Sequence, residues 1–249
     1  MESSGSSNII DELVPGKARK SCKVVHFLRH AEGKQNIAGK FPGGYSLEEN
    51  EDCGLTEFGQ IQAQDIHEKL KAETVSLMPE AEIIVCSNMR RALQTASISF
   101  VHLTGSIPFV GLECVREQTG LNPCARRMPV SVHKTEYPVF DFDLIESEND
   151  AMWHKYTAMY PGGREPEADV VNRGLEFLDW LEKRNEKSLI VVTHASFLRM
   201  FFTQLIGVSV DDYRRFENCE MRSFLVSFYD DSPPSVVPLT AENIPPELA

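Results

Sequence analysis

The amino-acid sequence predicts an α/β protein, a three-layer α/β/α sandwich with a mostly parallel central sheet. Three apolar runs rich in β-branched residues support this fold class, and they lie at 24–28, 82–86 and 187–193. Runs of this length and composition are typical of strands that are buried on both faces. Helical patterns separate the runs along the chain, and strands that alternate with helices favour a parallel sheet.

The first half of the chain alternates between strand and helix patterns. Residues 39–54 interrupt this alternation, because their Gly, Pro, Glu and Asn content predicts a long exposed loop. Thr56 follows as the expected N-cap of a helix whose small-residue stripe begins at Gly59 and Ala63. In order, the predicted elements are a strand at 23–28, the loop, the helix after 56, a strand at 82–86, a helix at about 89–101 and a short strand at 107–110.

The second half begins with a stretch in which regular patterns dissolve. Residues 114–166 contain five prolines among mixed aromatic and acidic residues, so we expect an irregular insertion over the sheet edge that carries the candidate site. The alternation resumes with a helix at 167–184, a strand at 187–193, a helix after 194 and a last strand at 223–229. We therefore expect one domain, residues 21–230, between a flexible N-terminal tail, 1–20, and an irregular C-terminal tail, 231–249.

Composition and charge argue against several classes of protein. The 249 residues carry a net charge of −12, which disfavours a nucleic-acid surface or an anionic-membrane anchor. No run is apolar and long enough to span a bilayer, and the N-terminus has no secretory signal pattern. The six cysteines are scattered without metal-ligand spacing, which predicts reduced thiols rather than disulfides or zinc. We expect a cytoplasmic protein with no nucleic-acid or membrane partner and no metal.

Ionisable residues follow the three apolar runs at the point where each predicted strand ends. Arg29 and His30 follow the first strand. Arg90 and Arg91 lie just after the second, and His194 follows the third. Because the carboxyl ends of parallel strands meet at one edge of a sheet, we expect these residues to share a crevice. Each alone has an ordinary structural explanation, but two imidazoles and two guanidiniums together indicate a pocket for a phosphate or carboxylate.

The other candidate residues have weaker patterns. Arg126 and Arg127 lie in the insertion, where a solvated turn is a slightly better interpretation than a substrate clamp. Five histidines are interpreted as structural or surface residues. His26 lies inside the first predicted strand and His67 on a polar helix face, whereas His102, His133 and His154 have no partner pattern.

Short motifs around the strand ends resemble those of a known family. In chain order they are Arg29-His30-Ala31 with Asn36 downstream, Leu55-Thr56-x-x-Gly59-x-x-Gln62-Ala63, Ser87-x-x-x-Arg91-Ala92-x-Gln94-Thr95-Ala96, Val115-Arg116-Glu117 and Thr193-His194-Ala195. Their order across residues 23–205 resembles the histidine phosphatase superfamily, also called phosphoglycerate-mutase-like. The likeness is greatest to uncharacterised plant and fungal phosphoglycerate mutase-like proteins. The motif match selects Arg91 over Arg90, and Ala31 and Ala195 stand where the family has glycine.

The resemblance implies a site for phosphoryl transfer. His30 would attack phosphorus and form a phosphohistidine. Arg29, Arg91 and His194 would bind the phosphoryl oxygens, and Asn36 would assist them. Positioning and charge stabilisation dominate phosphoryl transfer, so several donors around one phosphoryl group suit this chemistry. The family's chemistry implies neither a metal nor a cofactor.

The resemblance also implies a proton donor and leaves three functions open. Glu117 would protonate the leaving group and then activate water, with Glu113 as the alternative acid. We prefer a metal-independent phosphatase that hydrolyses a small phosphorylated metabolite, because the stretch 117–166 is unlike that of true mutases. Phosphoglycerate mutase-type transfer is the first alternative. A pseudo-enzyme that binds phosphorylated ligands is the second, and the intact set of site residues argues against it.

Overall fold

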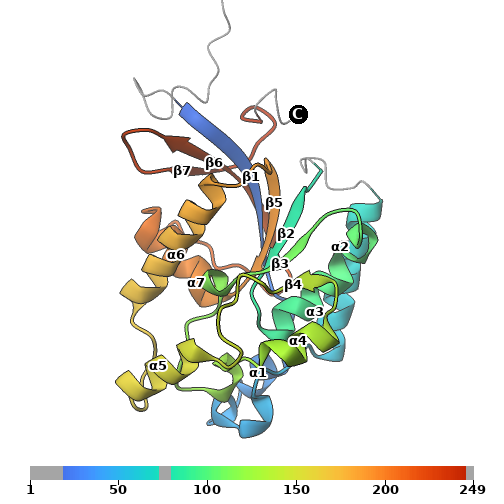
Figure 1. Ribbon diagram of the computed structural model, residues 1–249, viewed down its shortest axis with the longest axis vertical. Coiled ribbons are helices and arrows are strands. Elements are labelled where there is room, and N and C mark those ends of the chain that lie inside the picture. Colours follow the sequence, from blue (N-terminus) through green and yellow to red (C-terminus); the bar gives the residue numbers. More distant parts are fainter. Residues whose placement is uncertain (1–18, 73–79, 245–249) are drawn as a thin grey trace, which may run out of the picture.

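The computed structural model describes residues 19–72 and 80–244. Within these residues a seven-stranded sheet has the order β4-β3-β2-β5-β1-β6-β7, and helices cover both of its faces (Figure 1). β1 to β5 pair in parallel, whereas β6 and β7 extend the sheet antiparallel, which confirms the predicted mostly parallel fold. The strands are β1 (Arg19–Arg29), β2 (Ile83–Cys86), β3 (Phe109–Gly111), β4 (Phe140–Asp141), β5 (Ser188–Thr193), β6 (Met221–Tyr229) and β7 (Ser235–Pro238).

The helices form two layers, one on each face of the sheet, as Figure 1 shows. One layer contains α2 (Glu57–Lys71), α3 (Arg90–Ser99) and α4 (Val130–Glu136); the other contains α6 (Glu167–Glu182) and α7 (Ala195–Met200), which continues as a π-helical turn, Phe201–Leu205. α1 (Lys34–Ala38) and α5 (Ala151–Met159) lie beyond the end toward which β1 runs. Among the described residues, no helix combines the length and the apolarity needed to cross a bilayer.

Alternate residues of the central strands point into two separate cores. Phe27 of β1 packs on the side of α6 and α7, where its ring contacts Phe177 and Phe201. Its neighbour Leu28 faces the opposite core, which includes Leu93 of α3. Burial on both faces explains why these strands are continuously apolar in sequence.

The register aligns the carboxyl ends of the three central strands. Arg29 of β1 pairs with Thr193 of β5, and Cys86 of β2 pairs with Val192. Hydrogen bonds continue past the strand ends, from His30 N to Thr193 O at 2.9 Å and from Ser87 N to Val192 O at 2.9 Å. The residues after the three strands therefore meet at one edge, as predicted.

The small-residue start of α2 brings this helix against the loop that follows β1. Thr56 caps the helix, because its side chain accepts a hydrogen bond from Gly59 N at 2.9 Å. A Cβ atom at Gly59 would lie 2.1 Å from the carbonyl oxygen of Glu32, so only glycine permits this approach. The predicted cap is confirmed, and the small-residue stripe explains the close approach.

Several segments are more regular than their sequences suggest. The predicted irregular insertion contains α4, α5 and β4, short elements that the many prolines and polar residues conceal in the sequence. The prediction of an irregular C-terminal tail is wrong for residues 235–238, because β7 pairs with β6. Residues 19 and 20 belong to β1 rather than to a flexible tail, and residues 1–18 lie outside the described part of the chain.

Candidate active site

A cavity of about 240 Å³ opens at the edge where the central strands end. Among the residues that the sequence singles out, Arg29, His30, Asn36, Arg91 and Glu117 line it. His194 lies beside it, with the centre of its ring 5.0 Å from that of His30. The fold thus gathers at one place residues that are up to 165 positions apart, as 29 and 194 are.

His30 is held as a neutral imidazole with one defined tautomer. Its Nδ1 lies 2.7 Å from the carbonyl oxygen of Ala31, which can only accept, so Nδ1 carries the hydrogen and Nε2 has a free lone pair. Burial, and then the positive charges of Arg91 and Arg29, lower the pKa of His30 well below 6.5. The imidazole therefore stays unprotonated at neutral pH.

His194 is the second buried imidazole of the site. Its Nε2 forms a hydrogen bond of 2.7 Å with the hydroxyl of Ser87, the residue that follows β2. Its Nδ1 is buried without a hydrogen-bond partner among the described residues. Burial, followed by the charge of Arg91, also lowers the pKa of His194 well below 6.5. An uncharged imidazole with one free nitrogen can donate to or accept from a bound ligand.

The two guanidiniums at the cavity floor are anchored at one end only. Arg29 donates from Nη1 to Phe216 O at 2.8 Å, and Arg91 donates from Nη1 to Cys124 O at 2.8 Å. The Nε atoms of both arginines are buried without a partner among the described residues. Buried polar groups usually have partners, so these unpaired donors indicate a place for an anion.

Asn36 helps to shape the start of α1. Its Oδ1 accepts hydrogen bonds from Gly33 N at 2.9 Å and from Asn218 Nδ2 at 3.3 Å. Asn218 also donates to His30 O at 3.0 Å, so the side chain of Asn36 is tied to the backbone of His30.

The structure separates the two candidate acids. Glu117 lines the cavity, and its Oε1 accepts from Gln118 N at 2.9 Å and from Ser196 N at 3.1 Å in the first turn of α7. Glu113 instead accepts from Asn88 Nδ2 and Arg127 Nε, both at 2.8 Å. Burial alone would raise the pKa of Glu113, but the charges of Arg116 and Arg127 outweigh it and lower that pKa. Glu113 is thus engaged as a structural carboxylate.

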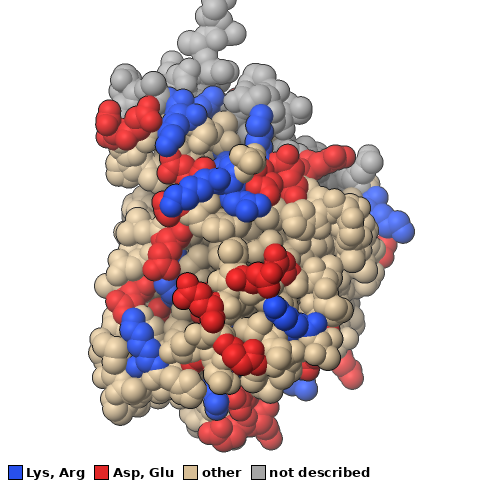
Figure 2. Space-filling view, viewed as in Figure 1, with Lys and Arg blue, Asp and Glu red and all other residues tan. Residues whose placement is uncertain are grey.

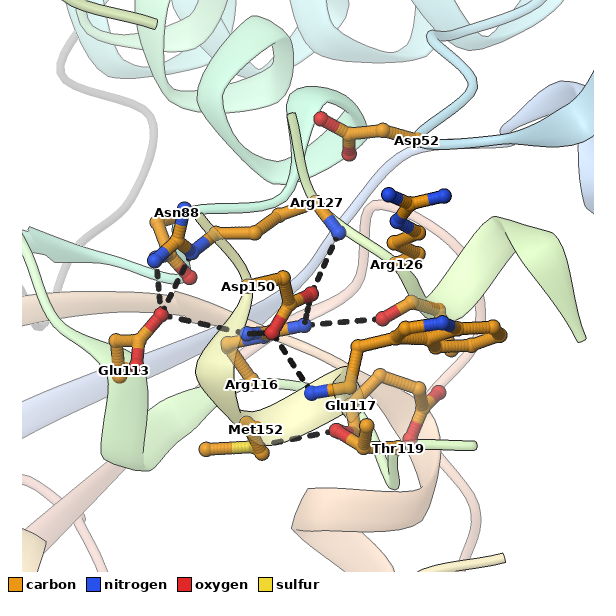
Figure 3. Close-up of polar contacts among 12 residues, drawn as sticks. Asp52, Asn88, Glu113, Arg116, Glu117, Thr119, Arg126, Arg127, Asp150 and Met152 are labelled. Carbon is orange, nitrogen blue, oxygen red and sulfur yellow. Dashed lines mark hydrogen bonds and ion pairs between the residues drawn. The ribbon is translucent and has the colours of Figure 1, made fainter. Parts of the chain in front are cut away.

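A buried polar network supports the segment that carries Glu117 (Figure 3). Arg116 is fully buried and donates to both oxygens of Asp150, at 2.9 and 2.7 Å. The backbone N of Arg127 donates to the same carboxylate at 2.8 Å. From the α6 side, Arg173 donates to Cys114 O at 2.7 Å and to Arg116 O at 3.0 Å. These bonds fix the backbone next to Glu117 from two directions.

Replacing Asp150 by Ala is expected to lower the free energy of unfolding by about 3–5 kcal/mol, because the buried Arg116 loses its two-oxygen partner and keeps only the longer contact with Glu113, at 3.3 Å. Urea unfolding measures this loss. Asp179→Ala is the control, since Asp179 forms an exposed pair with Lys183 at 2.6 Å that is expected to contribute less than about 1 kcal/mol. Equal losses in the two variants would contradict the assigned role of the network.

The interpretation as a solvated turn agrees with Arg126 but needs correction for Arg127. Arg126 forms an exposed ion pair with Glu51 at 3.3 Å. Arg127 is neither in a solvated turn nor a substrate clamp: it is buried and donates to Ser147 O and Glu148 O inside the insertion, at 2.7 and 2.9 Å. A run of buried carbonyls is a partner that no sequence motif reveals.

The remaining histidines lie outside the cavity lining, and four of them have partners that the sequence does not reveal. His26 forms a bond of 2.7 Å with Ser223 Oγ, and His67 lies 3.1 Å from His102 between their Nδ1 atoms. His133 forms a buried pair of 2.8 Å with Asp52, which makes it a structural residue whose partner no sequence pattern reveals.

Sequence reasoning missed two arginines of the cavity, Arg164 and Arg215. Both lie in loops, and neither follows a strand end or a recognised motif. Together with Arg29 and Arg91 they face a single lining carboxylate, Glu117. The cavity is therefore cationic in a chain whose net charge is −12, whereas the face in Figure 2 has acidic and basic side chains interspersed.

The buried histidines make stability depend on pH. Burial lowers the pKa of His26 to about 4, and it lowers the pKa of His30 and His194 well below 6.5. The unfolded chain takes up protons near pH 6.5 and the folded chain only at lower pH, so stability is complete above pH 6.5 and falls as the pH falls. The loss per histidine is about 1 kcal/mol between pH 6.5 and 5.5, and its slope approaches about 1.4 kcal/mol per pH unit at lower pH. Urea unfolding is expected to show a loss of up to about 3 kcal/mol between pH 6.5 and 5.5, and equal stability at both values would contradict these shifts.

Comparisons with known proteins agree with this geometry. Residues 25–120 and 141–238 match the sequence model of the histidine phosphatase superfamily, branch 1. A phosphoglycerate mutase-like protein of Arabidopsis thaliana is 31% identical over 237 residues, which cover 82% of this chain and 84% of that protein.

Solved structures share the fold at lower identity. The α-ribazole phosphatase of Shigella flexneri superposes with a TM-score of 0.53 at 19% identity, covering 89% of this chain and 98% of that one. The ecdysone phosphate phosphatase of Bombyx mori superposes with a TM-score of 0.55 at 16% identity, covering 88% and 96%. The match of the family model over most of the chain, together with the Arabidopsis relative, shows that this protein belongs to the histidine phosphatase superfamily.

Proposed function

We propose that this protein is a phosphomonoesterase that hydrolyses a small phosphorylated metabolite through a phosphohistidine at His30. The observation that carries the proposal is a group of three unpaired buried nitrogens on side chains in or beside the cavity that His30 lines. Arg29 Nε, Arg91 Nε and His194 Nδ1 are buried without partners among the described residues. The oxygens of one phosphoryl group would supply the missing acceptors.

In the first step, His30 Nε2 attacks phosphorus and the bond from phosphorus to the ester oxygen breaks. The hydrogen bond from His30 Nδ1 to Ala31 O holds the ring in the tautomer that this attack requires. Arg29, Arg91 and His194 stabilise the negative charge on the phosphoryl oxygens as it redistributes. The guanidiniums provide positive charge at the place where a metal ion does so in other phosphoryl-transfer enzymes, so the proposal is metal-independent.

Glu117 moves the protons in both half-reactions. Its Oε1 accepts two backbone hydrogen bonds, which leaves Oε2 to carry the proton that passes to the departing oxygen. In the second step, the Glu117 carboxylate takes a proton from a water molecule that attacks the phosphohistidine. The bond from phosphorus to nitrogen breaks, inorganic phosphate leaves, and neutral His30 is restored.

Trapping the covalent intermediate tests the proposal. The enzyme is mixed with ³²P-labelled glycerol phosphate in the presence of EDTA and quenched in alkali, since phosphohistidine is labile in acid. Trypsin cleaves after Arg29 and Lys34, so the label is expected in the peptide 30–34, which contains His30 as its only histidine. His194 falls in the separate peptide 188–199.

Each other outcome rejects a defined part of the proposal. Label in the peptide 188–199 would make His194 the nucleophile. Turnover without any labelled peptide would reject the covalent route, and loss of labelling in EDTA would reject the metal-independent route. Transfer of the label to added phosphoglycerate, rather than its release as inorganic phosphate, would favour a mutase over a phosphatase.

A further inference from the structure

The described arginines that line the cavity form no ion pair with a carboxylate, unlike the arginines elsewhere. Apart from Arg19, which has another interaction, every described arginine outside the cavity forms an ion pair with a carboxylate. The described arginines that lack such a partner are Arg29, Arg91, Arg164 and Arg215, and all four line the cavity. In a chain with a net charge of −12, this concentration of unpaired cations indicates a site for more negative charge than Glu117 supplies.

The four arginines form two levels that differ in burial. Arg29 and Arg91 are 4% and 2% exposed and lie beside His30. Arg164 and Arg215 are exposed, so they line the cavity at its mouth. Arg215 also lies close enough to Arg29 that its charge adds to burial in lowering the pKa of Arg29. The repulsion between these two positive charges would be relieved by an anion bound between or beside them.

The backbone that carries Arg215 is anchored, although its guanidinium has no partner within residues 19–72 and 80–244. Arg222 donates to the carbonyl oxygen of Arg215 at 2.8 Å, and its guanidinium stacks 3.9 Å above the ring of Phe216. Phe216 O in turn accepts the hydrogen bond from Arg29. Arg215 is thus held next to the inner level of the site.

The backbone beside Arg164 is anchored in a comparable way. Glu165 N donates to Thr119 O at 2.8 Å, and the carboxylate of Glu165 pairs with Arg173 at 2.8 Å. A Cβ at Gly120 would lie 3.0 Å from Gly163 O and 3.3 Å from Arg164 Cα, so the two loops touch through a glycine. Both mouth arginines therefore present free guanidiniums on fixed backbone, which lowers the entropic cost of binding.

We propose that Arg164 and Arg215 form a second anion-binding subsite, so that the substrate carries a second phosphate or carboxylate on its leaving group. This inference rests on the proposed function, in which the inner level takes the phosphoryl group that is transferred. The mouth arginines then contact the part of the substrate that departs, and they act in specificity rather than in the chemical step. Arginine suits both anions, because its planar donors bind carboxylate and phosphate through two hydrogen bonds.

Binding of non-hydrolysable phosphonates tests the subsite without relying on catalysis. Calorimetry compares propylphosphonate with a series of α,ω-bisphosphonates on chains of two to five carbons, so that the spacing of the two groups is covered. The wild type is expected to bind at least one bisphosphonate about 10-fold or more tightly than propylphosphonate, as a charge-assisted hydrogen bond predicts. In the double variant Arg164→Gln/Arg215→Gln this preference is expected to fall to about threefold or less.

The control removes the same charge elsewhere. Arg199→Gln/Arg214→Gln also removes two exposed arginines, but both form ion pairs outside the cavity, with Glu167 and Glu220. This variant is expected to keep the preference. An equal loss in both double variants would show a general electrostatic effect, and a wild type with no preference for any bisphosphonate would also overturn the subsite.

The two proposals fail independently. A bisphosphonate preference that depends on Arg164 and Arg215 supports the subsite even if no label appears on His30. Label on His30 without such a preference supports the phosphatase and rejects the subsite.

Discussion

Replacing His30 by Asn is expected to lower kcat/KM for phosphomonoesters by about 10⁴- to 10⁶-fold, the range seen when an enzyme loses its nucleophile. Asn retains an N–H donor toward Ala31 O but has no nucleophilic nitrogen, so the loss would reflect chemistry rather than a lost hydrogen bond. The measurement is phosphate release from glycerol phosphate, with the trapped phosphoenzyme as a second readout. Both are expected to vanish together.

His154→Asn is the matched control, because His154 is exposed and lies outside the cavity. Thermal unfolding of both variants separates a misfolded protein from an inactive one. A folded His30→Asn variant that retains more than about a hundredth of the wild-type rate would show that another residue attacks phosphorus.

Glu117→Gln is expected to show a loss that depends on the leaving group. Protonation matters greatly for an alkoxide and little for a nitrophenolate, so the single-turnover rate of enzyme phosphorylation is expected to fall about 10²- to 10⁴-fold with glycerol phosphate. With 4-nitrophenyl phosphate the fall is expected to be much smaller. Gln keeps an oxygen that accepts from Gln118 N and Ser196 N, so the geometry is preserved.

Glu113→Gln is the matched control for this prediction. Its side chain is bound by Asn88 and Arg127 outside the cavity, so a loss that is the same for both leaving groups is expected, through altered packing. Equal losses for the two substrates in Glu117→Gln would remove Glu117 as the acid. A leaving-group-dependent loss in Glu113→Gln would transfer the role to Glu113.

The sequence predicts well which residues converge at the cavity, because the ends of adjacent parallel strands lie at one edge of a sheet. His30 and His194 each follow a strand that is buried on both faces and therefore continuously apolar, and Arg29 is the last residue of β1. The choice between Arg90 and Arg91 needs more than this pattern, since both follow β2. Burial distinguishes them in the structure: Arg90 pairs with Glu136 at 2.9 Å near the surface, whereas Arg91 is 2% exposed.

The parts that sequence reasoning missed depend on contacts between distant loops. Arg164 reaches the cavity because its loop packs on Gly120, and Arg215 because Arg222 holds its carbonyl. The pair of Asp52 and His133 joins residues that are 81 positions apart. Strand β7 forms because the edge of β6 offers it backbone hydrogen bonds. The four residues of β7 show no alternation of apolar and polar side chains that would predict a strand from the sequence.

The position of β1 in the sheet has a consequence for the order in which the protein is made. β1 is the first described strand to leave the ribosome, yet both of its neighbours are synthesised much later, β5 from Ser188 and β6 from Met221. Until then neither hydrogen-bonding edge of β1 has its native partner strand. Pairing across so long a stretch of chain is slow, and exposed strand edges are prone to aggregate. We therefore expect fragments that end before β5 to be insoluble, and nascent chains to need protection until the last quarter of the sequence has emerged.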